Sequence, residues 1–322
     1  MISGLLEAWS EYFPNDELHV VVKDRSAIDL PKVTVHEARW PLHPLNNLFG
    51  LKELARNVGA EVVFSQNFWA RAKVPSFTFV HDVLFLSNPE WFSWKERLYF
   101  SLIPFGMQRA AGVFTSSATE KRRMLDRVRG VRFVESVGLA SAPALSKAEA
   151  VAPRGITPGN FLICVGRLNE RKNLRRVIAG FLRMRNEHTA APSLFVVGPA
   201  DGLKANDFMA DSDAVRFLGP VSDGELRWLY ENARGLIFGS LDEGFGLPPV
   251  EALSFGCPVA VSDIPVMHEV VGSAATYFDP RDIGSIAASI SVLADSSREV
   301  PGRALGWDSV VKRVRGVICE KI

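Results

Sequence analysis

The sequence has 322 residues, of which 47% are hydrophobic and 23% are charged, and its formal net charge is +1. This composition excludes a disordered or fibrous chain. The length exceeds what one hydrophobic core usually organises, so we expect two domains. A net charge near zero gives no general reason to expect nucleic acid as a partner, because such binding usually needs a clearly basic surface.

Three cysteines, Cys164, Cys257 and Cys319, are widely spaced and lie in or beside apolar runs, so we expect buried thiols. No cysteine or histidine cluster has the spacing of a metal site, and we expect no metal. No apolar run approaches the roughly 20 residues that span a bilayer. The first residues also lack the basic start and long apolar core of a secretory signal. The sequence therefore predicts a cytoplasmic protein.

In the first half of the chain, strand-like runs alternate with amphipathic stretches, which is typical of βαβ units. The chain opens with a helical pattern where a doubly wound domain usually opens with a strand, so we expect this domain to lack its first strand. Residues 139–159 are rich in Ala, Ser, Pro and Gly and predict a linker. The expected strands are residues 17–22, 61–65, 76–80, 112–116 and 131–135.

The second half repeats this alternation with continuous apolar strands, which favours a parallel sheet covered on both faces. Ser222 and Glu225 have the spacing of a capping box at a helix start. The sequence thus predicts an α/β protein. The expected strands are residues 161–166, 193–198, 214–219, 235–239 and 257–262. The expected parts are α/β domains at 1–145 and 155–300 and a C-terminal helix at 301–322.

Positive side chains crowd the predicted helix start that follows residues 161–166. Without compensation, each of these charges opposes the helix dipole at a cost of about 0.3–1 kcal/mol. A phosphate or diphosphate at the carboxyl end of this parallel strand would compensate them. A solvated basic helix face is the alternative interpretation. The residues are Arg171, Lys172, Arg175 and Arg176.

A loop rich in glycine and proline follows residues 235–239. Gly244 and Gly246 let the backbone approach a ligand closely, and Pro248 or Pro249 can open a helix. The amides near Gly246 and Leu247 are then free to bind phosphate oxygens.

Two carboxylates, Glu243 and Glu251, stand eight positions apart in this segment. We expect Glu251 to lie inside the first helical turn, where the dipole keeps it ionised, and to bind a ribose diol. Glu243 in the loop would lie nearer a transferred sugar. A capped helix with two surface carboxylates is the alternative, but it would not need the cluster of glycine and proline.

The segment EGFGLPPVE, with GRLNERKN before it and EALSFGCPVAVS after it, resembles the retaining GT-B glycosyltransferases of family 4, the group 1 glycosyltransferases. The resemblance covers most of residues 160–295. It implies two Rossmann-like domains that face each other across a cleft, with the acceptor on the N-terminal side and the nucleotide sugar on the C-terminal side. It also implies that Arg167 and Lys172 hold the donor diphosphate, that Glu243 contacts the donor sugar and that Glu251 contacts the ribose.

Further donor-binding positions follow from the same resemblance, and Glu269 in a later loop is an additional candidate. These positions are Gly166, Ser240, Gly244, Phe245, Gly246 and Leu247.

The N-terminal half also resembles the family, through a His81-Asp82 pair that follows the strand expected at residues 76–80. His81 is a candidate catalytic residue that would donate a hydrogen bond to the transferred sugar or to the phosphate, and a structural histidine is the alternative. Ser116 and Ser117 are expected to cap the next helix.

Residues 91–105 carry six aromatic side chains together with Lys95 and Arg97. This composition fits an interfacial helix, which would suit a lipid-linked acceptor and peripheral contact with a membrane. We favour the alternative, in which the aromatic side chains pack in the core.

The resemblance implies retaining transfer of a hexose from a nucleotide-diphosphate sugar to a saccharide or lipid-linked acceptor, in the assembly of cell-surface polysaccharide or lipopolysaccharide. GDP-mannose is the favoured donor, and UDP- or dTDP-sugars remain open. No permanently bound cofactor and no metal are expected, and the location would be the cytoplasm, including the cytoplasmic face of the membrane. The alternatives are a catalytically impaired nucleotide-sugar-binding subunit and a sugar-nucleotide 2-epimerase of the same fold.

Overall fold

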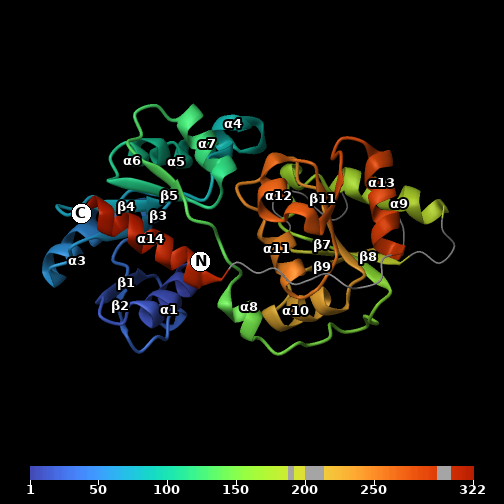
Figure 1. Ribbon diagram of the computed structural model, residues 1–322, viewed down its shortest axis with the longest axis horizontal. Helices are drawn as coiled ribbons and strands as arrows, with labels where there is room; N and C mark the ends of the chain where they lie inside the picture. The colour runs from blue at the N-terminus through green and yellow to red at the C-terminus, as the bar shows by residue number, and fades with distance from the viewer. Residues whose placement is uncertain (188–191, 200–213, 296–305) are drawn as a thin grey trace. The chain divides into compact units, whose positions relative to one another are not determined.

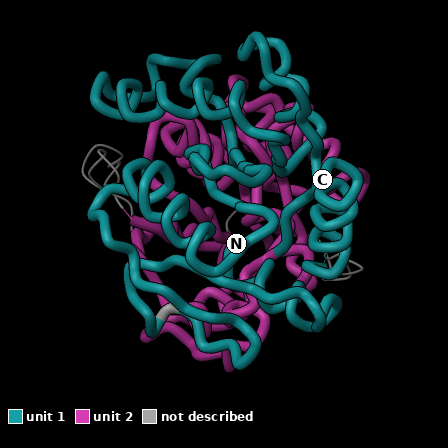
Figure 2. The backbone as a smooth tube through the Cα atoms, turned by 90° about the vertical axis from the view of Figure 1, so that its left-hand side faces the viewer, with its two compact units in different colours: residues 1–140, 305–322 teal, residues 141–304 magenta. Residues whose placement is uncertain are grey.

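The computed structural model describes residues 1–187, 192–199, 214–295 and 306–322. The chain divides into two compact units, Met1–Ala140 with Leu305–Ile322, and Ser141–Ala304 (Figure 2). The division lies within the predicted linker at residues 139–159. Residues 301–305 of the predicted C-terminal segment lie outside the described residues.

The described part of the second unit is built on one parallel sheet of six strands in the order β12-β11-β10-β7-β8-β9 (Figure 1). The chain enters at β7 in the middle, adds β8 and β9 on one side, and then adds β10, β11 and β12 on the other. All pairs of neighbouring strands are parallel. The strands are β7 Phe161–Val165, β8 Ser193–Val197, β9 Val215–Gly219, β10 Gly235–Phe238, β11 Val259–Ser262 and β12 Ala275–Phe278.

Helices cover both faces of this sheet, because successive side chains of a strand point to opposite faces. Leu162 of β7 faces a core shared with α9 and α13, whereas the neighbouring Phe161 stacks on Trp228 of α10. The predicted capping box of α10 is confirmed, with both the Ser222 and the Glu225 side chains bonded to the other residue's backbone. The helices and turns are α8 Pro143–Lys147, η4 Glu170–Lys172, α9 Leu174–Glu187, α10 Asp223–Asn232, α11 Leu247–Ser254, α12 Pro265–Val270, η6 Gly272–Ala274 and α13 Ile283–Asp295.

The order of the strands reverses between β7 and β10, which are neighbours in the sheet. In open parallel sheets, ligands bind at the carboxyl ends of the strands next to such a switch point. The chain leaves β7 at Gly166 and leaves β10 at Gly239. Both segments that the sequence singled out therefore begin at the edge where a ligand is expected.

The first unit carries its described strands in two parallel sheets, β1-β2 and β3-β4-β5-β6. The chain opens with a helix, α1, as the sequence indicates. Strand β2 was not predicted. The strands are β1 Leu18–Val22, β2 Val33–Glu37, β3 Val63–Gln66, β4 Ser76–Phe79, β5 Gly112–Thr115 and β6 Val134–Ser136.

Short helices and turns connect these strands, and among the described helices of the whole chain none is both long and apolar enough to cross a membrane. The elements of the first unit are α1 Ile2–Tyr12, η1 Arg25–Ala27, α2 His43–Leu45, the π turn η2 Asn46–Gly50, α3 Leu51–Val58, α4 Leu84–Ser87, η3 Pro89–Trp91, α5 Trp94–Phe100, α6 Leu102–Met107 and α7 Ala118–Arg127.

The C-terminal helix α14, Trp307–Lys321, packs against α1 and belongs to the first unit. Arg315 donates two hydrogen bonds to the Asp16 carboxylate, at 2.7 and 2.9 Å. The guanidinium of Arg315 also lies over the ring of Phe13. Cys319 on this helix is exposed, so the expectation of a buried thiol is wrong at this position. The buried side of α14 ends at Ile318, and Cys319 points away from it.

Candidate functional site

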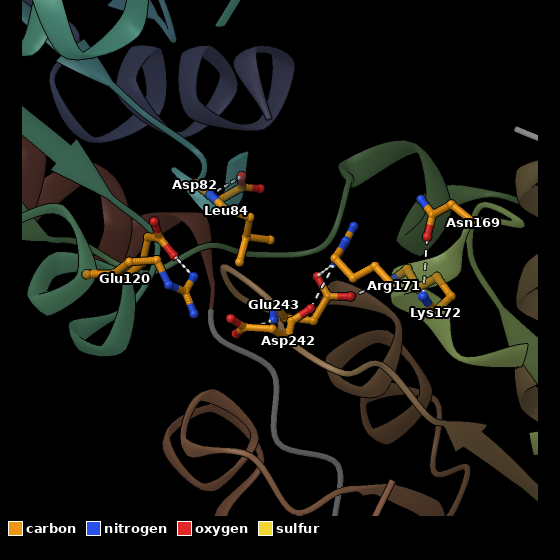
Figure 3. Close-up of polar contacts among 9 residues, drawn as sticks. Asp82, Leu84, Glu120, Asn169, Arg171, Lys172, Asp242 and Glu243 are labelled. Atoms are coloured by element: carbon orange, nitrogen blue, oxygen red, sulfur yellow. Dashed lines mark hydrogen bonds and ion pairs between the residues drawn. The ribbon is translucent and has the colours of Figure 1, made fainter. Parts of the chain in front are cut away.

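Glu243 joins two cations at the switch point of the second unit (Figure 3). Lys172 Nζ donates to Glu243 Oε1 at 2.6 Å, and Arg171 forms an ion pair with Glu243 Oε2. The backbone ties the same segments together, since Leu241 N donates to Arg171 O at 2.9 Å and Arg171 Nη1 donates to Asp242 O at 3.2 Å. Residues 71 positions apart in the sequence thus meet, because β7 and β10 are neighbours in the sheet.

Burial opposes ionisation of Glu243, but the charges of Lys172 and Arg171 and their hydrogen bonds outweigh it and lower the pKa of Glu243 to about 2. Burial also lowers the pKa of Lys172, and the Glu243 carboxylate counters part of that effect. Glu243 therefore supplies the negative charge that the basic segment was predicted to need. A ligand phosphate bound here would share Lys172 and Arg171 with Glu243 or replace Glu243 as their partner.

The turn before α9 sets the position of Lys172. Asn169 Oδ1 accepts a hydrogen bond from Lys172 N at 3.2 Å, and Asn173 follows in the left-handed region with a φ of 55°. The long helix consequently starts after Lys172. Arg175 and Arg176, in its first turn, are exposed. The solvated-face interpretation therefore fits these two arginines, but not the half-buried Lys172.

A small cavity lies beside Lys172 and holds about 10 Å³, roughly the room of one water molecule. Gly166, Arg167 and Ser240 line it together with Lys172. Ser240 is fully buried, and its Oγ has no hydrogen-bond partner among the residues that the structure describes. The structure thus brings four of the predicted site residues together around one polar cavity.

The glycine and proline loop opens helix α11. Gly246 has a φ of 94°, and a Cβ atom at this position would overlap the methyl group of Met267. Leu247 is the first helical residue, and Pro248 and Pro249 follow within the first turn. Because amides in the first turn of a helix lack acceptors within the helix, this loop presents donors at the end of β10.

Glu251 lies in the second turn of α11, not in the first, and its Oε2 accepts a hydrogen bond from Tyr230 OH at 3.0 Å. Burial raises the pKa of Glu251, and the hydrogen bond from Tyr230 offsets only part of this effect. The expectation that Glu251 lies inside the first helical turn is therefore wrong. Sequence reasoning also missed Tyr230, which is fully buried and reaches Glu251 from α10.

The remaining predicted positions of the second unit differ in exposure. Gly244 and Phe245 are buried in the loop, with Phe245 only 8% exposed. Glu269 stands exposed on α12. The buried Phe245 side chain therefore anchors the loop.

His81 belongs to the first unit, where it follows β4. Its backbone N donates to Asn67 Oδ1 at 3.2 Å, and its ring stands edge-on to Phe79 with centroids 5.1 Å apart. Burial, followed by the charge of the chain's N-terminus, lowers the pKa of His81 to about 4. The imidazole is therefore neutral at pH 7 and has one N–H to donate.

Buried Glu120 organises the turn after β4. Val83 N donates to Glu120 Oε1 at 2.8 Å, and Arg123 pairs with the other carboxylate oxygen. Ser117 Oγ accepts from Glu120 N at 3.0 Å, which confirms Ser117 as the cap of α7. Ser116 precedes the cap and does not fill this role. The S-x-x-E spacing of residues 117–120 could have pointed to Glu120.

The part of the chain that carries the motifs matches a known family. Residues 147–301 match the model of the glycosyl transferases group 1. An O-antigen chain mannosyltransferase of Salmonella typhimurium is 31% identical over 218 residues, which cover 66% of this chain and 58% of that protein. The chain thus spans less than two thirds of the length of this relative.

Solved structures share the fold along nearly the whole chain. A sucrose-phosphate synthase from Thermosynechococcus elongatus has a TM-score of 0.73 at 16% identity, covering 99% of this chain and 91% of its own. HepE from Anabaena, in complex with UDP and glucose, has a TM-score of 0.68 at 15% identity, covering 98% and 95%. The chain therefore has the GT-B fold of two Rossmann-like units. Within that class, residues 147–301 are similar to the group 1 glycosyltransferases.

Proposed function

We propose that the chain transfers mannose from GDP-mannose, with retention of configuration, to a saccharide or lipid-linked acceptor in the assembly of a cell-surface polysaccharide or lipopolysaccharide. One observation carries this proposal: Lys172, Arg171 and Glu243 meet at the switch point of a parallel sheet. Relatives in Salmonella typhimurium and Escherichia coli named O-antigen chain mannosyltransferases support the choice of sugar and acceptor.

In this proposal, Lys172 and Arg167 hold the donor diphosphate beside the amides that open α11. Departure of the nucleotide diphosphate places negative charge there, and one preorganised donor in such a site is typically worth about 3 kcal/mol. Two cations of the chain would offset that charge, so we expect transfer to proceed without a divalent metal. His81, as a neutral imidazole, would donate its N–H to the transferred sugar or the phosphate.

The ion pair suggests how Glu243 takes part. Before a donor binds, Glu243 keeps Lys172 charged and in place. When the diphosphate arrives, we expect Lys172 to turn toward it and free the carboxylate. An ionised carboxylate accepts hydrogen bonds from hydroxyl groups and donates none. Glu243 would then receive hydroxyl groups of the donor sugar, and Glu251 would receive those of the ribose.

Substitution of the cavity cations tests this assignment. We expect Lys172→Ala and Arg167→Ala each to lower release of GDP from GDP-mannose in the presence of acceptor by about a hundredfold, because each removes one preorganised donor to the leaving group. Arg175→Ala, which removes an exposed arginine from the same helix start, is the matched control. Undiminished turnover in Lys172→Ala contradicts the assignment of Lys172 to the diphosphate. Complete loss of transfer by the unmodified protein in EDTA contradicts the expectation that no divalent metal is needed.

The acceptor and the product separate this function from its alternatives. Product from GDP-mannose with its anomeric configuration retained, read by NMR, supports the retaining transfer. Donor binding without transfer to any acceptor favours an impaired binding subunit. Epimerisation of a UDP-sugar without acceptor favours the 2-epimerase.

We propose peripheral membrane contact through helices α5 and α6. Trp94 and Leu98 of α5 are 69% and 66% exposed, and Leu102 and Phe105 of α6 are 47% and 48% exposed. Core packing, which the sequence favoured, holds only for neighbours such as Phe100, which packs against a buried cluster. Basic side chains flank the exposed stripe: Lys95 lies over Trp94, and Arg109 lies over Phe105.

Vesicle binding tests this contact. We expect the protein to co-sediment with phosphatidylglycerol vesicles at low salt and the double variant Trp94→Ala/Leu98→Ala to lose at least about tenfold in affinity, because it removes two large apolar side chains from the stripe. Trp40→Ala, at an exposed tryptophan outside the stripe, is the control. Equal sedimentation of the double variant and the unmodified protein excludes this surface.

A further inference from the structure

A buried tyrosine contacts one of the two carboxylates of the candidate site. Tyr230 of α10 is fully buried, and its hydroxyl group donates a hydrogen bond to Glu251 Oε2 at 3.0 Å. Glu251 lies on α11, the helix that follows the glycine and proline loop, and is half-buried. A phenylalanine would fill the same space as Tyr230, so packing alone does not account for the hydroxyl group.

Tyr230 is held in place independently of this hydrogen bond. Its ring stacks on Phe255, the residue that ends α11, with centroids 6.0 Å apart and an angle of 9° between the rings. The capping box fixes the start of α10, and Arg227 on the same helix donates to two backbone oxygens in and after α8, at 2.8 and 3.1 Å. The hydroxyl group is therefore preorganised, because both the ring and the helix that carry it are anchored by other contacts.

The hydrogen bond runs in one direction only. Burial, followed by the charge of Glu251, raises the pKa of Tyr230 well above its ordinary value of 10, so the hydroxyl group stays protonated and donates. On Glu251, burial raises the pKa, the hydrogen bond from Tyr230 lowers it, and the charge of Asp223 raises it. Tyr230 thus favours the ionised carboxylate, which accepts hydrogen bonds and donates none.

We propose that Tyr230 is a positioning residue that acts through Glu251 on the ribose of the donor nucleotide. By holding Oε2, the tyrosine fixes the plane of the carboxylate, so that Glu251 accepts hydrogen bonds from the two ribose hydroxyl groups in a set direction. This role rests on the proposed function, in which Glu251 binds the ribose, and extends it to a residue outside the motif segments. It depends on the ribose alone and therefore applies to GDP and UDP alike.

Isothermal titration of the full chain with GDP tests this role in the variant Tyr230→Phe. The substitution removes the hydroxyl group and keeps the ring, so the stacking on Phe255 is retained. We expect the Kd for GDP to rise about tenfold, because a carboxylate without its orienting donor loses a charge-assisted hydrogen bond to the ribose. Tyr277→Phe is the matched control and keeps the original Kd, since its hydroxyl group bonds the backbone oxygens of Met267 and Gly272, at 3.3 and 2.6 Å.

The ribose hydroxyl groups distinguish positioning from a purely structural tie between α10 and α11. We expect the unmodified protein to bind GDP at least about tenfold more tightly than 2′-deoxy-GDP, and Tyr230→Phe to lose most of this preference. A structural tie would weaken the binding of both nucleotides equally. In a Glu251→Ala background, Tyr230→Phe should change neither Kd, since the tyrosine then has no carboxylate to orient.

Three outcomes overturn the role of Tyr230: an unchanged Kd for GDP in Tyr230→Phe, the same preference for GDP over 2′-deoxy-GDP in this variant and the unmodified protein, and an equal effect of Tyr230→Phe with and without the Glu251 carboxylate. Absence of binding of both GDP and UDP overturns this role and the proposed function together. Binding of UDP in place of GDP moves the same comparison to UDP and 2′-deoxy-UDP and rejects only the choice of GDP-mannose. GDP binding that responds to Tyr230→Phe, in a protein that transfers no mannose, supports the role and rejects only the transfer.

Discussion

At the scale of single residues, Glu243 connects the stability of the second unit with its proposed chemistry. A carboxylate that is only 7% exposed keeps its charge because Lys172 and Arg171 both reach it. Breaking a buried ion pair is costly, since the remaining charges lose their partner. The same residue therefore fixes the two cations and, in the proposed function, receives the donor sugar.

The low pKa of Glu243 predicts a pH-dependent contribution to folding. Because the folded pKa of about 2 lies below the ordinary value of 4.5, the stabilisation is complete above about pH 4.5 and disappears as the pH falls toward 2. We expect Glu243→Gln to lower the free energy of unfolding by about 3 kcal/mol at pH 7. Urea denaturation at pH 7, 5 and 3.5 measures the difference, which should narrow below pH 4.5.

Glu170→Gln, at an exposed carboxylate of the neighbouring turn, controls for the removal of a surface charge. A difference between Glu243→Gln and the unmodified protein that stays constant from pH 7 to 3.5 contradicts the assignment of the pKa.

Sequence reasoning at this scale located residues within motifs but not their partners. Lys172 and Glu243 were both identified, yet nothing local indicated that they pair across 71 positions. The same holds for Tyr230, whose hydroxyl group reaches Glu251 from another helix. Such contacts depend on the order of the strands in the sheet and on which helix packs on which face of it. Residue spacing within a motif predicts neither of these.

At the scale of elements, strands with a buried, continuous apolar run were all predictable, whereas two of the strands at sheet edges were missed. The strands β7 and β10 are buried along almost their whole length. The unpredicted strands β2 and β12 lie at the edges of their sheets and are mostly half-exposed. An edge strand has solvent on one side, so its sequence carries a weaker apolar signal.

The loop that opens α11 depends on Gly246. We expect Gly246→Ala to lower the free energy of unfolding by about 2–4 kcal/mol, because it adds left-handed backbone strain of about 1–2 kcal/mol to a collision with Met267. Chemical denaturation measures this change. Gly256→Ala is the matched control, since Gly256 also has a positive φ, of 70°, but no atom lies within 4 Å of an added Cβ.

The control should show the strain alone, about 1–2 kcal/mol. Equal destabilisation by Gly246→Ala and Gly256→Ala contradicts the prediction. It would show that the loop moves enough to avoid the collision with Met267.

At the scale of the whole molecule, alternation of strands and helices predicted an α/β chain, but the topology came only from the structure. The switch between β7 and β10 explains why two segments far apart in sequence share one edge of a sheet. The C-terminal helix α14 returns to pack on α1, a pairing held by Arg315 and Asp16 that no local pattern signals. The resemblance to a known family, and not periodicity, supplied the expectation of a nucleotide sugar.

The central claim is that Lys172 and Arg167 bind the diphosphate of a nucleotide sugar. Thermal unfolding with GDP-mannose tests this claim most directly. At 100 times the Kd, we expect the unmodified protein to gain about 2.7 kcal/mol. Lys172→Ala should gain little at the same concentration, while Arg175→Ala should match the unmodified protein. Absence of stabilisation in the unmodified protein, or equal stabilisation of Lys172→Ala, contradicts the account.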